Sequence, residues 1–294
     1  MSEQAIVLNQ LTKHYGTHRG INDLSFSVNE GEFFGFIGPN GAGKSTTIRT
    51  LMGLIHPSGG NASIFGLDCQ TKASVIARDV GYLPSENSYY ENMKVRELLQ
   101  YTADLYGMDC ETKMYELSER LNLDLTRKIA DLSLGNKKKV GIVSAIMTSP
   151  KLLIMDEPTS GLDPLMQREF FSILQERNRE GATVFLSSHI LSEIQRNCTR
   201  AAIIREGTLL ACGSVEELAR TNARRVTLRG SAEVQVLSGI RDCRQTEEGL
   251  SFLYSGDMQL LLNALAGGKV EDLTIAEPDL EEVFLHYYEK EESK

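Results

Sequence analysis

The sequence predicts an α/β fold whose central sheet is parallel and buried on both faces. Two observations support this prediction. KLLIM and TVFLSS are continuous apolar runs of strand length, and a segment of helical spacing near residues 165–180 separates them. The apolar run EFFGFIG leads into a glycine-rich loop, which a segment of helical spacing follows. Strands and helices that alternate in this way form sheets whose two faces are covered by helices.

Composition and charge indicate a globular protein that does not bind nucleic acid. The 294 residues are 41% hydrophobic and 24% charged, enough for one large domain or for a large and a small one. The net charge of −9 opposes nonspecific binding to a phosphate backbone. The five cysteines form no CxxC pair, as in reduced cytosolic proteins. Without a signal peptide or a membrane-spanning run, we expect a soluble chain that reaches a membrane only through a partner.

The N-terminal segments predict antiparallel strands ahead of the glycine-rich loop. AIVLNQL and LSFSV alternate in polarity, and Leu24, Phe26 and Val28 fall on one face of the second segment. EFFGFIG then predicts a short buried strand. KSTTIRTLMGL has helical spacing and stops at Gly53 and Pro57.

From about residue 90 to residue 148 the chain has a helical character. Apolar positions in the first helix fall on one stripe, which we expect to face the core. The stripe consists of Val95, Leu98, Leu99, Thr102, Leu105 and Tyr106.

Residues 224–294 predict a small C-terminal α/β appendage, an accessory domain. VTLRG, SFLYSGD and VEDLTIA have the composition of strands, and MQLLLNALAGG that of a short helix. A final amphipathic helix is expected after Pro278, where Asp279 and Glu282 have the spacing of a capping box.

The loop from Gly38 to Ser45 has the spacing GxxxxGK[ST] and lies between a predicted strand and a predicted helix. In such a loop, glycines let backbone N–H groups surround phosphate oxygens, and the following helix presents its positive N-terminus. The pattern predicts that Lys44 reaches the β- and γ-phosphates of a nucleotide and that Ser45 offers its hydroxyl to Mg²⁺. It is typical of a P-loop NTPase.

Two carboxylates end the apolar strand in LLIMDE. Ligands of open α/β sheets bind at the carboxyl ends of strands, where Asp156 and Glu157 are expected to lie. We expect Asp156 to hold Mg²⁺ directly or through water, and Glu157 to polarise the attacking water.

Four motifs occur in the order found in ATP-binding-cassette (ABC) ATPases: GPNGAGKST, LSLGN, LLIMDEPTSGLDP and a histidine after TVFLSS. On these motifs, the chain resembles the cytosolic ATPase subunit of an ABC transporter. The resemblance implies an ABC ATP-binding domain over residues 1–220, with a mixed core sheet, an antiparallel β-subdomain and a helical subdomain at about residues 88–148. The tail EPDLEEVFLHYY resembles the extension of ATPases that serve ABC-2-type, mainly exporting, permeases.

The resemblance also implies roles for individual residues in binding ATP and Mg²⁺. Tyr15 is similar to the aromatic residue that stacks on adenine, Glu157 to the catalytic carboxylate, and His189 to the residue that contacts the γ-phosphate. Lys44, His189 and Mg²⁺ would supply positive charge to the reaction. The phosphate-binding loop is similar at Gly38, Pro39, Asn40, Gly41, Ala42, Gly43, Lys44, Ser45 and Thr46.

A second ATPase subunit is implied by three further residues. Ser133 and Gly135 resemble the groups that complete the nucleotide site of the partner, and Asp163 resembles the residue that links the two subunits. A monomer should therefore bind ATP yet hydrolyse it poorly.

The chain departs from the family pattern at two places. The family has a glutamine after the strand GYLP, where this chain has Ser85 followed by Glu86. Our hypothesis is that Ser85, or Glu86 beside it, holds Mg²⁺ through water. In LSLGN, Leu134 and Asn136 replace a glycine and a glutamine, and the lysines at 137–139 are expected on the first turn of a helix, partly solvated.

Together the motifs predict an ATP-hydrolysing subunit that powers a separate membrane permease, with export as the expected direction. It would lie in the cytoplasm, on the inner face of the cell membrane. Tyr89 and Tyr90 are either permease contacts or aromatics packed on their own domain. A soluble ABC protein acting on ribosomes or nucleic acid is an alternative that the acidic charge and the single cassette disfavour. A non-hydrolysing regulator is disfavoured by Glu157 and His189.

Overall fold

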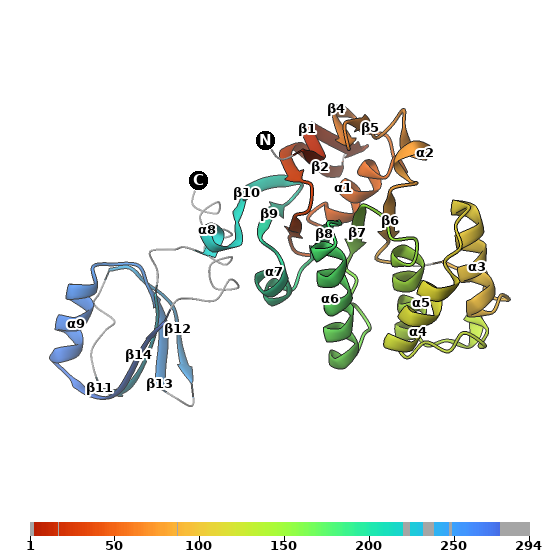
Figure 1. Cartoon of the computed structure of the whole chain (residues 1–294). Helices are drawn as coiled ribbons and strands as arrows, with labels where there is room; N and C mark the ends of the chain where they lie inside the picture. The colour runs from red at the N-terminus through yellow and green to blue at the C-terminus, as the bar shows by residue number, and fades with distance from the viewer. Residues whose placement is uncertain are drawn as a thin grey trace. The chain divides into compact units, whose positions relative to one another are not determined.

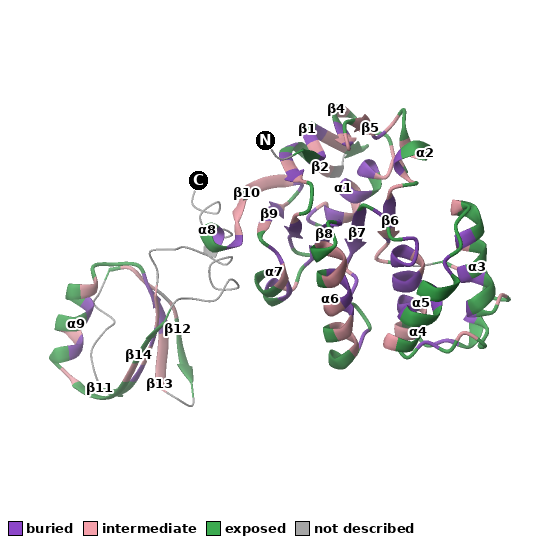
Figure 2. Cartoon of the chain, viewed as in Figure 1, coloured by how far each residue is buried: buried purple, intermediate pink, exposed green. Residues whose placement is uncertain are grey.

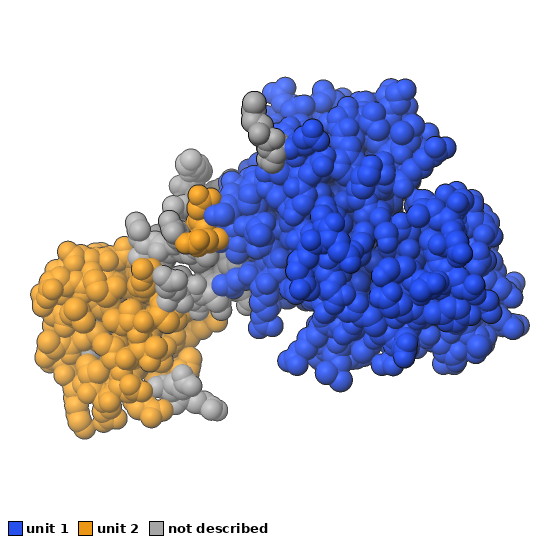
Figure 3. All heavy atoms as spheres, viewed as in Figure 1, with its two compact units in different colours: residues 1–215 blue, residues 216–294 orange. Residues whose placement is uncertain are grey.

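The structure, a computed structural model, describes residues 3–16, 18–86, 88–219, 224–231, 238–246 and 249–276 (Figure 1). The chain divides into two compact units, residues 1–215 and residues 216–294 (Figure 3). Within the described segments, no helix is both long enough and apolar enough to span a membrane.

A mixed six-stranded sheet forms the centre of the first unit. Five strands run parallel to one another, and β10 pairs antiparallel with β9 at one edge. Apart from the exposed Lys151, KLLIM and TVFLSS lie in β7 and β8, which are adjacent, parallel and fully buried, as the sequence predicts. In spatial order the strands are β10 (Thr208–Ser214), β9 (Arg200–Arg205), β3 (Phe33–Ile37), β8 (Thr183–Ser188), β7 (Leu152–Asp156) and β6 (Val80–Leu83).

A second sheet, the predicted antiparallel one, packs on the first through aromatic side chains. Phe26 stacks on Phe34 of the core sheet with ring centroids 5.7 Å apart, and Phe34 stacks on Phe185 at 5.9 Å. Truncating such a buried phenylalanine to alanine costs about 3–5 kcal/mol. The strands, in spatial order, are β2 (His18–Asn29), β1 (Gln4–Tyr15), β4 (Gly59–Ile64) and β5 (Leu67–Asp68).

Helices α3, α4 and α5 pack together beside the β6 edge of the core sheet (Figure 1). Buried residues are concentrated in the central strands and on α5 (Figure 2). The helices of the first unit are α1 (Lys44–Leu51), α2 (Ala73–Ile76), α3 (Val95–Tyr106), α4 (Glu111–Arg120), the 3₁₀ turn η1 (Ile129–Asp131), α5 (Leu134–Ile146), α6 (Pro164–Arg179) and α7 (Leu191–Asn197), with α8 (Val215–Ala219) at the boundary.

The predicted stripe on α3 is buried or half-buried at each position except Leu105, where the prediction is wrong. Val95 and Leu99 are fully buried, but Leu105 is 68% exposed. At 100° per residue Leu105 lies about 80° from Val95 around the helix, so it falls at the edge of the buried face. Ala103 is buried on the other edge.

In its described residues, the second unit contains a four-stranded antiparallel sheet with the helix α9 packed against it. Its core combines Val226 and Phe252 of the sheet with Leu261 and Leu265 of the helix. Three strands and the helix match the predicted ones, β12 is additional, and the helix expected after Pro278 lies outside the described residues. The elements are β12 (Ile240–Thr246), β13 (Gly249–Tyr254), β11 (Arg224–Ser231) and β14 (Lys269–Ala276), in spatial order, and α9 (Met258–Ala266).

Candidate functional site

The glycine-rich loop connects β3 to α1 in a conformation that requires its glycines. Gly41 and Gly43 have φ of 81° and 105°, in the left-handed region that side chains disfavour. A Cβ on Gly43 would lie 2.8 Å from the carbonyl oxygen of Gly20, and a Cβ on Gly38 would lie 2.4 Å from that of Ile204. Because α1 begins at Lys44, its positive N-terminus faces the loop. The loop therefore forms an anion-binding cradle.

Lys44 is held under this loop. Its side chain is only 6% exposed, and Nζ donates hydrogen bonds to the carbonyl oxygens of Gly38 at 2.6 Å and Pro39 at 3.1 Å. The same Nζ lies 3.1 Å from Oε1 of Glu157. The ammonium group thus joins the loop to the carboxyl end of β7.

Asp156 and Glu157 lie at that end of β7 in different environments. Asp156 is 1% exposed, and its Oδ1 accepts a hydrogen bond of 2.5 Å from Oγ of Ser187 on the neighbouring β8. Glu157 has φ of 50°, and such a conformation costs about 1 kcal/mol or more for a residue with a side chain. Its Oε2 lies 2.7 Å from Nδ1 of His189. Within the described part of the chain, its buried Oε1 accepts no hydrogen bond.

A cavity of about 320 Å³ lies over the loop and unites residues from distant parts of the sequence. Tyr15, at the end of β1, borders it with 44% of its side chain exposed. Ala42 is buried in the loop, while Asp156 and His189 lie beside the cavity, where His189 contacts Glu157. The lining consists of Tyr15, Gly20, Pro39, Asn40, Gly41, Gly43, Lys44, Ser45, Thr46, Ser85 and Glu157.

Oxygen ligands suitable for Mg²⁺ border this cavity. Mg²⁺ prefers hard oxygen donors and is usually held by one or two protein ligands plus phosphates of the substrate. The hydroxyls of Ser45 and Ser85 and the Oε1 of Glu157, which pairs with Lys44 but accepts no hydrogen bond within the described residues, are such donors. Asp156 adds a buried carboxylate. Among the described residues, no group of three or more His, Cys, Asp or Glu side chains could hold a metal ion alone. The donors therefore fit an ion that shares its ligands with a bound nucleotide.

Ser133 and Gly135 lie at the start of α5, outside the cavity lining of this chain. Ser133 caps the helix, with its Oγ 3.4 Å from the backbone nitrogen of Asn136. A Cβ on Gly135 would lie 2.6 Å from the carbonyl oxygen of Gly161, so the start of α5 packs against the loop before α6. Leu134 between them is 76% exposed.

The expectation that the lysines after LSLGN are partly solvated is correct for Lys137 and wrong for Lys138 and Lys139. Lys138 and Lys139 are only 4% and 9% exposed, because α5 packs its first turns against β6 and the loop that follows it. Nζ of Lys138 donates to the carbonyl oxygens of Pro84 at 3.3 Å and Ser85 at 3.0 Å. Burial lowers the pKa of Lys138, and the charges of Asp156 and Glu157 oppose this shift.

Glu193 is a buried carboxyl group next to the site that the sequence did not reveal. It lies on α7, four residues after His189, and accepts a hydrogen bond of 2.7 Å from Oγ of Ser188 and another from Thr159. Burial raises the pKa of Glu193, and the charge of Glu157 adds to this shift. The position of Glu193, four residues after His189, is the sequence feature that could have indicated it.

The sequence of this chain is similar to those of known proteins. A family profile described as ABC transporter matches residues 21–160. The bacitracin transport ATP-binding protein BcrA of Bacillus licheniformis is 35% identical over 296 residues, which cover 95% of this chain and 96% of that protein. The chain belongs to the ABC transporter family. The predicted resemblance and fold class are confirmed.

Two further proteins are similar to this ABC protein over most of its chain. The Nod factor export ATP-binding protein I of Rhizobium sp. (strain N33) is 31% identical, and the alignment covers 100% of both chains. A solved structure of the ATP-binding subunit of an ABC transporter is 33% identical with a TM-score of 0.70, covering 74% of this chain and 92% of that one. As a member of the family, the chain is an ATPase that powers a membrane transporter.

Proposed function

We propose that the cavity binds ATP with Mg²⁺ and that hydrolysis there drives a separate permease that exports a substrate. The observation that carries this proposal is the contact of Glu157 with both Lys44 and His189 at the rim of the phosphate cradle. A relative named for Nod factor export supports the export direction. The chain then works on the cytoplasmic face of the membrane, bound there through the permease.

ATP binding uses Tyr15 for the base and the glycine-rich loop for the phosphates. Tyr15 is partly exposed at the cavity rim, where its ring can stack on adenine. The phosphates lie in the loop from Gly38 to Thr46, whose backbone and helix N-terminus attract anions. Lys44 leaves the carbonyl oxygens it now contacts and binds the β- and γ-phosphates.

Hydrolysis depends on Glu157. When Lys44 turns to the phosphates, Oε1 of Glu157 is released and accepts a proton from the attacking water. His189 stays on Oε2 and orients the carboxylate, while its ring lies near the position of the γ-phosphate. Mg²⁺, when bound, neutralises charge on the phosphate oxygens.

Ser45, Asp156 and Ser85 are the proposed ligands of Mg²⁺, directly or through water. Ser85 lines the cavity where the family has glutamine, and a serine reaches less far, so a water is required between Ser85 and the ion. Turnover at limiting Mg²⁺ should fall in Ser85→Ala, with Glu86→Ala as the neighbouring comparison. If both variants keep the Mg²⁺ dependence of the wild type in the assembled complex, this part of the proposal is wrong.

A second ATPase subunit completes each site in this proposal. Ser133 and Gly135 at the start of α5 face the ATP of the partner, and Asp163, which caps α6, links the two subunits. Residues 88–148 act as the helical subdomain of an ATP-binding domain that ends near residue 220.

The permease contact is proposed on the outer surface of α3. Tyr90 is 64% exposed and packs edge-on against Tyr101 at 6.3 Å, and Leu105 lies one turn further along the helix. Tyr89 is excluded from this surface because its hydroxyl is buried, which raises its pKa. Copurification with the permease encoded beside this chain should be lost in Tyr90→Ala/Leu105→Ser and retained in Leu54→Ser, an exposed leucine elsewhere. Equal copurification of both variants would contradict the contact.

The proposed ATPase is tested by Glu157→Gln. The variant should bind ATP like the wild type, while turnover falls about 100-fold or more because the general base is lost. Glu30→Gln, at an exposed carboxylate, is the control and should keep full turnover. Wild-type turnover in Glu157→Gln would refute the role of Glu157, and a wild type that neither binds nor hydrolyses ATP would refute the proposed function itself.

A further inference from the structure

Lys138 has no part in the function proposed so far, yet it is one of the most buried charged groups near the site. Its neighbour Lys137 is partly exposed and forms an ion pair of 3.4 Å with Glu91. Lys138, one residue further, is 4% exposed and directs Nζ at two carbonyl oxygens, those of Pro84 and Ser85. Two adjacent and identical side chains therefore have different environments.

The burial of this ammonium group has to be compensated. A buried charge is costly unless it is hydrogen-bonded and near opposite charge. The two carbonyl oxygens supply acceptors, and the carboxylates of Asp156 and Glu157 favour the positive charge of Lys138 through space. Since these carboxylates border the nucleotide cavity, Lys138 is electrostatically part of the same cluster without lining the cavity.

The two carbonyl groups belong to the segment that carries Ser85. They follow the end of β6 at Leu83, and their hydrogen bonds to Lys138 restrict the backbone there. A restricted backbone also restricts where the short Ser85 side chain enters the cavity. At the other end of the contact, Lys138 lies in the second turn of α5, the helix that starts with Ser133 and Gly135.

We propose that Lys138 is a positioning residue that couples the start of α5 to the Ser85 side of the nucleotide cavity. Because Lys138 contacts the backbone of Pro84 and Ser85, the coupling does not require a long side chain at position 85. Movement of α5 when a second subunit contacts Ser133 and Gly135 is transmitted to Ser85 through the hydrogen bonds of this ammonium group. The inference rests on the proposed function for its effect on turnover, but the coupling itself is a property of the nucleotide-free chain.

The first measurement needs no nucleotide. Lys138→Met keeps most of the side-chain length and removes the charge, and Lys137→Met is the matched control in the same lysine run. Hydrogen exchange of the backbone amides of Ser85 and Glu86 in the full chain should be about tenfold faster in Lys138→Met, because hydrogen bonds from a charged donor are lost. Lys137→Met should exchange like the wild type. If Lys138→Met does not fold, Lys138→Gln removes the charge and retains an amide donor.

The second measurement is turnover in the presence of the permease. Lys138→Met should lower kcat about 10- to 100-fold through misplacement of Ser85, while the Kd for ATP changes less than about twofold because Lys138 does not line the cavity. Lys138→Arg, which keeps the charge and the donors, should recover part of kcat. A purely structural defect would instead change Kd and kcat together and would not be relieved by arginine.

The outcomes separate this inference from the proposed function. Unchanged exchange at Ser85 and Glu86 in Lys138→Met refutes the coupling, whatever the enzyme does. A wild type that hydrolyses ATP, with equal kcat in Lys138→Met and Lys137→Met, also refutes the coupling and leaves the ATPase intact. A wild type that does not hydrolyse ATP refutes the proposed function, and the exchange measurement still decides whether Lys138 holds the segment.

Discussion

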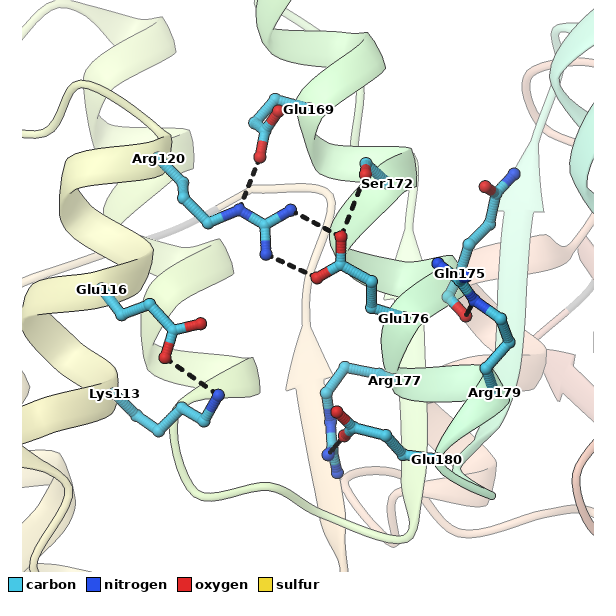
Figure 4. A network of polar contacts seen from close by, with 10 residues as sticks. All are labelled: Lys113, Glu116, Arg120, Glu169, Ser172, Gln175, Glu176, Arg177, Arg179 and Glu180. Carbon is cyan, nitrogen blue, oxygen red and sulfur yellow. Dashed lines mark hydrogen bonds and ion pairs between the residues drawn. The ribbon is translucent and has the colours of Figure 1, made fainter.

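An ion-pair network joins α4 to α6 (Figure 4), and its removal should destabilise the first unit measurably. Arg120 Nε contacts Glu169 at 2.6 Å, and its Nη1 and Nη2 contact the two oxygens of Glu176 at 2.6 and 2.9 Å. The fork of the guanidinium thus matches one carboxylate at both oxygens, the strongest geometry for such a pair. Because α4 lies among the helices beside β6 and α6 follows Asp163, the network links two parts of the unit.

The magnitude follows from distance and exposure. Two unit charges about 4 Å apart attract by about 4 kcal/mol at an effective dielectric constant of about 20. The side chains of Arg120, Glu169 and Glu176 are 25%, 32% and 40% exposed, so solvent screening, desolvation and side-chain ordering remove most of this energy. We expect Arg120→Met, which keeps the apolar stem, to lose about 1–2 kcal/mol in total. For a unit of this size the Tm should fall by about 2–8 °C.

Lys113→Met supplies the control for this prediction. Lys113 lies on the same helix and pairs at 3.0 Å with Glu116, three residues along (Figure 4). This ion pair lies within α4 and links it to no other element. Such an exposed pair contributes about 0.5 kcal/mol or less. Thermal unfolding of the full chain, followed by circular dichroism, compares the two variants. A double-mutant cycle of Arg120→Met with Glu176→Gln should give a coupling energy of about 1 kcal/mol. Equal Tm values for the Arg120 and Lys113 variants, or a coupling energy of zero, would refute the reasoning.

The same network has a pH dependence with a defined sign. The hydrogen bonds from Arg120 hold the pKa of Glu176 below its ordinary value of 4.5. A carboxyl group with a lowered pKa in the folded state contributes stability above its unfolded pKa, and this contribution is lost as the pH falls through the folded pKa. The Tm difference between wild type and Arg120→Met should therefore be constant near neutral pH and shrink in acid below about pH 4.5. It should also shrink in 1 M salt.

Three other substitutions test the site and its surroundings. Tyr15→Ala should weaken ATP binding about tenfold in calorimetric titration, whereas Tyr15→Phe keeps the stacking ring and should bind normally; equal affinities would remove Tyr15 from the base site. Gly43→Ala should abolish ATP binding and lower the Tm, since φ is 105° and the added Cβ meets the Gly20 carbonyl at 2.8 Å; an unchanged Kd would contradict the cradle geometry. Burial raises the pKa of Glu193, so the stability it contributes is full below its ordinary pKa and is lost as the pH rises through the raised value. Glu193→Gln should therefore raise the Tm at pH 8 and raise it less at pH 5, and a Tm gain that is larger at pH 5 would show the opposite sign.

The phosphate cradle and the central strands could be predicted from sequence because their signals are local. The glycines at 41 and 43 are required by backbone angles within the loop itself, so the pattern carries its own structural reason. The runs LLIM and VFL are apolar because both faces of β7 and β8 are covered. In β12, by contrast, the sequence IRDCRQT is polar at an edge of the second sheet, and its pairing with β13 depends on register rather than on apolar composition.

The difference between Lys137 and Lys138 could not be predicted, because it arises from contacts distant in sequence. Successive helix positions point about 100° apart, so a one-residue error in the start of α5 would exchange the two environments. The acceptors of Lys138 lie at Pro84 and Ser85, more than fifty positions earlier in the chain. Glu193 is similar, since its partners Ser188 and Thr159 come from two different segments. The environment of each of these side chains depends on such partners, which the sequence alone does not identify.

Two serines at the end of β8 fix the position of the backbone before His189. Successive residues of a strand point to opposite faces, and here both are serines: Ser187 donates to Asp156, while Ser188 donates to Glu193. The backbone directly before His189 is therefore anchored on both faces of the sheet by buried carboxyl groups. His189 can change its contact with Glu157 by rotating its side chain, but moving its backbone would break two buried hydrogen bonds. In the proposed mechanism, the response to a bound γ-phosphate is therefore a rearrangement of side chains, such as the turn of Lys44 away from Glu157, and not a movement of this backbone.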